Sequence, residues 1–100
     1  MSQTVRFEKQ DSIAIVTIDR PEALNALNGD VIAELEQVVT ALESDRDVRC
    51  LILTGEGRSF VAGADIGEQY PLDLDGGRRW GQRGSALMRR IEKLEFPTIA

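Results

Sequence analysis

The sequence has no histidine and a single cysteine, Cys50, among its 100 residues. Without an imidazole it cannot supply a Ser-His-Asp triad, a Cys-His pair or a histidine-ligated metal site. One cysteine cannot close a disulfide within the chain, so the composition gives no sign of an oxidising compartment. These absences exclude several catalytic and metal-binding classes.

Long hydrophobic runs are also missing. No apolar stretch approaches the roughly 20 residues that a membrane-spanning helix needs, and residues 1–4 lack the charged and apolar regions of a secretory signal. Hydrophobic residues make up 42% and charged residues 29%, with a net charge of −5, which is typical of a globular chain. The length allows one domain at most. We therefore expect a cytoplasmic protein with no membrane segment.

The first half of the chain predicts strands on either side of a helix. Residues 5–10 and 13–18 indicate two strands joined by a hairpin turn, the first exposed and the second buried. Asn28 begins a helix, because apolar residues then recur on one helical face, and residues 48–53 indicate a buried strand. The second strand, the helix and the third strand form a βαβ unit with parallel strands and a right-handed crossover. Cys50 is expected to be a small core residue rather than a nucleophile.

The second half predicts a helix over residues 77–95 and a further strand from residue 98. Gly81 and Gly84 each lower helix propensity by roughly 1 kcal/mol relative to alanine, so we expect them to permit close backbone packing. Residues 76–95 carry six basic and two acidic side chains, with one aromatic, Trp80. Because charge runs usually lie in water and one aromatic forms no stacking platform, a solvated face or a subunit contact is favoured over nucleic-acid binding.

Two loops are similar to ligand-binding motifs but lack residues that those motifs require. Residues 55–60 have phenylalanine at the last glycine of the dinucleotide pattern G-x-G-x-x-G. The acidic loop 73–76 would place Pro71 and Gln82 at the first and twelfth positions of a calcium loop, where carboxylates are needed. The helix-borne glutamates have solvent-side spacing, and no two of them suggest a general acid and base. We predict no metal, and a phosphate-binding regulatory domain is disfavoured.

Four stretches of the chain form a pattern: IVTIDRP at 15–21, ALNALN at 23–28, LILTG at 51–55 followed by SFVAGADI at 59–66, and FPTIA at 96–100. Together they resemble the crotonase superfamily of enoyl-CoA hydratases and isomerases, and its short-chain hydratase branch, which includes 3-hydroxybutyryl-CoA dehydratases, is the most similar. Their order and spacing over all 100 residues carry the resemblance. It implies the α/β crotonase (ClpP-like) fold of repeated ββα units, with residues 1–100 as its N-terminal part and the sheet incomplete at residue 100.

The resemblance also implies where an acyl-CoA would bind. The backbone N–H of Ala64 would be one of two oxyanion-hole donors to the thioester oxygen, and the small residues around it would let a ligand approach the backbone. Substrate-binding residues for the CoA are expected at Ala23, Leu24, Ala26, Ala62, Gly63, Asp65 and Ile66. The second donor and two catalytic glutamates are expected beyond residue 100. The family uses no cofactor, since coenzyme A is part of the substrate, and usually forms homotrimers or dimers of trimers.

The leading expectation is reversible addition of water to a 2-enoyl-CoA, with the 100 residues alone inactive. Glu22 and Gly67 depart from the family pattern, since many relatives have a basic residue there that suits the CoA phosphates. From the residues alone, 62–66 also fit a tight turn into a helix with Asp65 as its N-cap. The alternatives are isomerase, dehalogenase or decarboxylase chemistry, or a non-catalytic α/β module.

Overall fold

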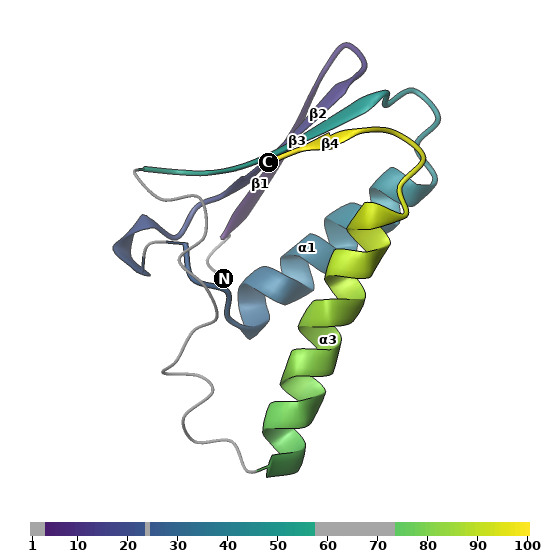
Figure 1. Cartoon of the computed structure of the whole chain (residues 1–100). Coiled ribbons are helices and arrows are strands. Elements are labelled where there is room, and N and C mark those ends of the chain that lie inside the picture. Colours follow the sequence, from purple (N-terminus) through teal and green to yellow (C-terminus); the bar gives the residue numbers. More distant parts are fainter. Residues whose placement is uncertain (1–3, 24, 58–73) are drawn as a thin grey trace.

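The computed structural model describes residues 4–23, 25–57 and 74–100. They form one mixed four-stranded sheet, in the order β1-β2-β3-β4, with two long helices (Figure 1). β1 pairs with β2 in antiparallel fashion, and β2, β3 and β4 run parallel. The elements are β1 (Val5–Gln10), β2 (Ile13–Ile18), the 3₁₀ helix η1 (Pro21–Ala23), α1 (Gly29–Glu43), β3 (Cys50–Gly55), α3 (Leu74–Glu92) and β4 (Thr98–Ile99). The predicted α/β class and the parallel pairing are confirmed.

The hairpin of β1 and β2 follows its prediction. Asp11 and Ser12 form the turn, and Asp11 adopts a left-handed φ of +55°, which aspartate tolerates better than most residues. Every β1 residue after Val5 is exposed, whereas β2 is mostly buried. β3 begins at Cys50 rather than at residue 48, because Cys50 pairs with Ile13, the first residue of β2.

Helix α1 begins where the sequence predicts. Asn28 is its N-cap, and the side-chain Oδ1 accepts a hydrogen bond of 2.9 Å from the Val31 N–H. Asp30 adds an acidic side chain in the first turn, where it interacts favourably with the helix dipole. This cap fixes where the chain leaves the preceding loop and turns into the helix.

Helix α3 begins and ends three residues earlier than predicted. Asp75 lies in its first turn, where the dipole favours an acid, and a three-residue turn from Ile91 to the Leu94 N–H closes the helix. The expectation of close packing at Gly81 and Gly84 is wrong for the described part of the chain. A Cβ at either position would meet no described atom within 4 Å.

Both long helices cover the same face of the sheet (Figure 1). The core forms where their apolar faces meet alternate residues of β2 and β3. Cys50 is half-buried and lies outside this core, because alternation places it on the opposite face from Leu51; its predicted core position is wrong. The buried core residues are Val5, Ala14, Val16, Ile18, Val31, Ile32, Leu35, Val39, Leu42, Val48, Leu51, Leu53, Leu87 and Ile91. Across the described ranges, neither helix combines the length and the apolarity that crossing a bilayer would require.

Two ion pairs join α1 to α3 along their exposed sides. Arg83 Nη2 lies 2.7 Å from Glu36 Oε1, and Arg90 Nη2 lies 2.8 Å from Glu43 Oε1. Each pair also has a second hydrogen bond from the arginine Nε, at 3.1 Å. Hydrogen bonding to the arginines lowers the pKa of both Glu36 and Glu43. Part of the predicted solvated basic face is therefore a contact between helices.

The two pairs should make stability depend on pH. A carboxyl pKa that is lower in the folded state stabilises the fold above its ordinary value of about 4.5, and this stabilisation disappears as pH falls through the folded pKa. We expect the double substitution Glu36→Gln and Glu43→Gln to lower Tm at pH 7, by much less than a core substitution, because both pairs are exposed. The difference from wild type should be largest above about pH 4.5 and should shrink as the pH falls further below that value.

Thermal unfolding followed by circular dichroism at several pH values would measure this. Glu92→Gln is a suitable control, because Glu92 is exposed and has no ion pair in the described residues. A Tm difference for the double variant that does not shrink as the pH is lowered from 7 through 4.5 and into the acid range would contradict the assignment.

Candidate functional site at the carboxyl ends of β2 and β3

The carboxyl ends of β2 and β3 lie side by side, because Ile18 at the end of β2 pairs with Gly55 at the end of β3. In open α/β sheets ligands bind outside the carboxyl ends of parallel strands. Residues 19–27 follow β2 at this edge, and Glu56 and Gly57 follow β3. The candidate site is therefore built on these two segments.

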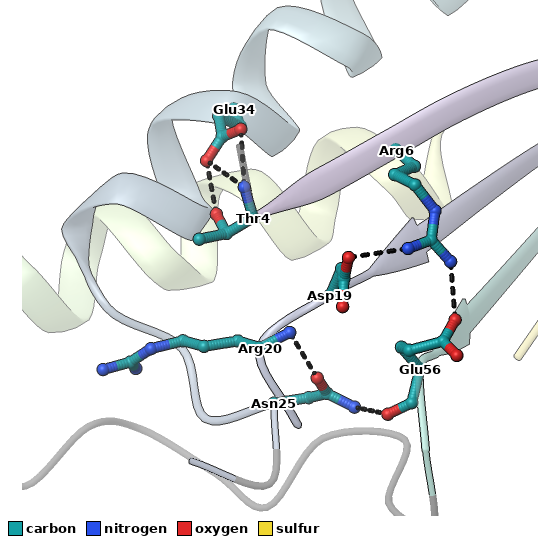
Figure 2. Close-up of polar contacts among 7 residues, drawn as sticks. All are labelled: Thr4, Arg6, Asp19, Arg20, Asn25, Glu34 and Glu56. Carbon is teal, nitrogen blue, oxygen red and sulfur yellow. Dashed lines mark hydrogen bonds and ion pairs between the residues drawn. The ribbon is translucent and has the colours of Figure 1, made fainter. Parts of the chain in front are cut away.

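Asn25 joins the two segments (Figure 2). Its side chain is 0% exposed. Its Nδ2 donates to the Glu56 carbonyl at 2.9 Å, and its Oδ1 accepts from the Arg20 N–H at 2.8 Å. The Asn25 backbone N–H donates to the Arg20 carbonyl at 2.8 Å. We call Arg20, Asn25 and Glu56 the strand-end clamp, since together they tie the chain after β2 to the chain after β3.

Further contacts hold the same edge. Arg6 Nη1 lies 2.6 Å from Asp19 Oδ2, and its Nη2 lies 2.6 Å from Glu56 Oε2 (Figure 2). Hydrogen bonding to Glu56, with the nearby charges of both carboxylates, raises the pKa of Arg6. Gly57 has a φ of +83°, and a Cβ there would lie 3.4 Å from Pro21 Cβ. Glycine is therefore the residue that this left-handed turn favours.

Glu34 contributes to the edge in a way that its helical spacing did not predict. Its carboxylate accepts hydrogen bonds from the Thr4 N–H, at 3.0 and 3.2 Å, and from the Thr4 hydroxyl (Figure 2). The expectation of a solvent-facing glutamate is wrong here, because the start of β1 supplies donors that a reading of the helix alone cannot include. The contact anchors β1 to α1.

The structure places two of the predicted CoA-binding residues at this edge. Ala23 ends η1, and the Ala26 carbonyl accepts a 3.0 Å hydrogen bond from Arg20 Nη1. Both belong to the segment that the strand-end clamp holds against β3. The remaining predicted site residues lie outside the described residues: Leu24, Ala62, Gly63, Ala64, Asp65 and Ile66.

Two hollows lie on the described surface. An apolar groove of about 460 Å³ runs between the start of α1 and α3, and Leu27, Ile32, Trp80 and Met88 are among its lining residues. A larger hollow of about 970 Å³, lined in part by Arg46, Arg49 and Phe96, lies where β3 and β4 begin. Because ligands of such sheets bind at the carboxyl ends of the strands, the smaller groove beside Leu27 is the better candidate for part of a site.

Comparison with known proteins identifies the family. Residues 8–100 match the family described as enoyl-CoA hydratase/isomerase. The chain belongs to this family. Over 96% of its length it is 48% identical to the short-chain-enoyl-CoA hydratase of Clostridium acetobutylicum, and over 98% it is 42% identical to the crotonyl-CoA hydratase of Syntrophomonas wolfei. It spans 37% and 38% of those two proteins.

Solved structures of the enoyl-CoA hydratase/isomerase family share the fold. An enoyl-CoA hydratase from Thermoplasma volcanium superposes with a TM-score of 0.89 at 30% identity, over 97% of this chain and 39% of that one. One from Bacillus anthracis superposes with a TM-score of 0.92 at 24% identity, over 96% of this chain and 38% of that one. The predicted crotonase fold is confirmed.

For this member of the enoyl-CoA hydratase/isomerase family, sequence reasoning missed the role of Asn25. The signal was present, since Asn25 is a polar residue between Leu24 and Leu27 in an otherwise apolar stretch, and asparagine tolerates a left-handed φ, here +60°. What could not be foreseen is its partner, Glu56, which lies 31 residues further along the chain.

Within the described ranges, no group of three or more Cys, Asp or Glu side chains is arranged to hold a metal ion.

Proposed function

We propose that the protein containing this chain is an enoyl-CoA hydratase that adds water reversibly to a short 2-enoyl-CoA. The observation that carries the proposal is the 42–48% identity, over nearly the whole chain, to relatives named as short-chain-enoyl-CoA and crotonyl-CoA hydratases. The placement of Ala23 and Ala26 at the carboxyl edge of the parallel strands supports it, because this is where such a sheet binds a ligand.

The chemistry assigns one role to this chain. Hydrogen bonding from the Ala64 N–H to the thioester oxygen would withdraw electron density from the conjugated double bond and make C3 electrophilic. The oxygen of water then bonds to C3 as one O–H bond of the water breaks and releases a proton, and the electron pair of the double bond moves into an enolate on the thioester oxygen. The thioester carbonyl re-forms when C2 takes up a proton, so that the net change is the addition of OH to C3 and H to C2. The N–H stabilises the negative charge that develops on that oxygen. We assign proton transfer to no residue of 1–100.

The apolar groove between α1 and α3 supports an acyl group as part of the substrate. Leu27 borders it immediately after the loop that holds Ala23 and Ala26, and Ile32, Trp80 and Met88 supply apolar surface. Burying a methylene on such surface contributes about 0.8 kcal/mol. The groove therefore lies beside the proposed CoA path and has the chemistry that an acyl chain requires.

Incubation of the complete protein with crotonyl-CoA tests the proposal directly. We expect the absorbance of the conjugated thioester to fall as water adds, and to recover when the reaction is started from 3-hydroxybutyryl-CoA. Binding of CoA without any turnover would reject the hydratase and retain the family. In that event a 3-enoyl-CoA substrate tests isomerisation of the double bond, the alternative activity in this family.

The proposed enzyme works in the cytoplasm as a homotrimer or a dimer of trimers, with acyl-CoA as its partner and no metal or redox cofactor. The family resemblance supports the assembly. Light scattering after size-exclusion chromatography of the complete protein would measure the assembly. A monomer at micromolar concentration would contradict it.

A further inference from the structure

We propose that Asn25 is a positioning residue of the acyl-CoA site, which fixes the loop 19–27 relative to the end of β3 through its side-chain hydrogen bonds. The inference rests on the proposed function. It also goes beyond that function, because it assigns a role to a side chain that need not touch the substrate.

The chemistry of Asn25 fits a positioning role better than that of a side chain that only fills space in the core. A fully buried polar side chain is costly unless its donor and acceptor groups are satisfied. Asn25 is 0% exposed, and its amide accepts from Arg20 in one segment and donates to Glu56 in the other. A carboxylate lacks the donor and an aliphatic side chain lacks both groups. An amide at this position can therefore bridge the two segments in a way that similarly sized side chains cannot.

The backbone around Asn25 shows that the loop takes its shape from this bridge. Both the N–H and the carbonyl of Arg20 bond to Asn25, the first to its side chain and the second to its backbone. Asn25 itself has a φ of +60°, a conformation that most residues avoid. The loop thus closes on Asn25, and the hydrogen bond from the Asn25 amide to the Glu56 carbonyl ties it to the end of β3.

The position of the clamp explains why its loss should affect substrate binding and turnover. Ala23 and Ala26, the described residues of the proposed CoA path, lie two residues before and one residue after Asn25. Glu56 and Gly57 lead directly into the sequence that holds Ala64. Misplacing a binding group by about 1 Å can cost on the order of 10²-fold in rate. Loosening the clamp should therefore reduce catalysis even in molecules that remain folded.

Asn25→Asp is the sharpest test, because it keeps the shape of the side chain and the acceptor for Arg20. It removes the donor to Glu56 and places a carboxylate against a carbonyl oxygen. In the complete protein, we expect kcat/KM for crotonyl-CoA, per mole of folded protein, to fall roughly 10- to 100-fold. Glycine tolerates the left-handed backbone conformation, and Asn25→Gly removes the side-chain hydrogen bonds to Arg20 and Glu56. This variant therefore provides a second test if Asn25→Asp does not fold.

Val48→Ala is the matched control. Val48 is 5% exposed and precedes β3 at the opposite end of the sheet, so its truncation lowers Tm without touching the clamp. We expect kcat/KM per mole of folded protein to stay at the wild-type value in this control. Amide hydrogen exchange adds a reading independent of activity: it should quicken at 19–27 and 55–57 in the Asn25 variants but not in Val48→Ala.

The positioning role would be overturned if the Asn25 variants lower Tm at least as much as Val48→Ala does but keep the wild-type kcat/KM per mole of folded protein. Unchanged exchange at 19–27 and 55–57 would do the same. If wild type itself neither binds CoA nor hydrates crotonyl-CoA, the proposed function fails instead, and a rise in exchange at the two segments would still support the clamp.

Discussion

Replacing Ala64 with proline is expected to lower kcat for crotonyl-CoA hydration by about 10²- to 10³-fold, the loss that follows removal of one oxyanion-hole donor. Proline has no backbone N–H, so the substitution removes the proposed donor itself, which no ordinary side-chain change can do. The interaction strengthens as charge moves onto the thioester oxygen, so its loss should fall on kcat more than on substrate affinity. Steady-state kinetics of the complete protein, with crotonyl-CoA as substrate, would measure it.

Ala64→Gly is the control for Ala64→Pro, because glycine keeps the N–H and also removes the methyl group. We expect Ala64→Gly to retain kcat within about tenfold of wild type. Calorimetric titration with CoA and thermal unfolding would show whether Ala64→Pro still binds and folds. A proline variant that binds CoA, folds and retains the wild-type kcat would disprove the oxyanion assignment.

Helix α1 and strand β2 were predicted correctly, because the residues that specify them are neighbours in the sequence. Asn28 supplies a helix cap, and the apolar spacing that follows it determines which face of α1 is buried. The apolar run of β2 fixes a buried strand, and the strand–helix–strand order fixes parallel pairing. These features require only neighbouring residues, and the structure shows each of them within one or two residues of its prediction.

The features that were missed depend on contacts between distant residues. Glu36 and Glu43 keep their places on the exposed side of α1, but they pair with arginines 47 residues away in sequence. Glu34, which was expected to face solvent, accepts from Thr4, 30 residues away. Cys50 has the apolar neighbours of a core residue, but the register of the sheet places it on the opposite face. Helix spacing and strand alternation do not contain this information.

The candidate site was likewise predictable only in part from the sequence. The parallel pairing of β2 and β3 was predicted, and it places the loops after these strands at one edge of the sheet, where Ile18 pairs with Gly55. The roles proposed for Ala23, Ala26 and Ala64 come from the family resemblance. Small apolar side chains have no chemistry of their own that would indicate such roles. The polar character of Asn25 is visible in the sequence, but its role is not, because its partner Glu56 lies 31 residues further along the chain.

The stability of this arrangement depends on the layer between sheet and helices, and Leu35→Ala should lower the free energy of unfolding by about 2–5 kcal/mol. Leu35 lies in the middle of α1 and is 2% exposed, so truncation leaves a cavity that the surrounding strands can fill only in part. Alanine has a slightly higher helix propensity than leucine. The whole loss can therefore be assigned to packing rather than to a weakened helix.

Gln37→Ala is the matched substitution on the exposed side of the same helix, where it creates no cavity; we expect a change within about 0.5 kcal/mol. Urea denaturation of both variants and wild type, with the midpoint and slope fitted separately, would measure the difference. The strand-end clamp joins the sheet to the loop that leads into α1, so a core that is loosened at Leu35 should also weaken CoA binding before it unfolds. A Leu35→Ala variant as stable as Gln37→Ala would show that α1 does not pack on the sheet as described.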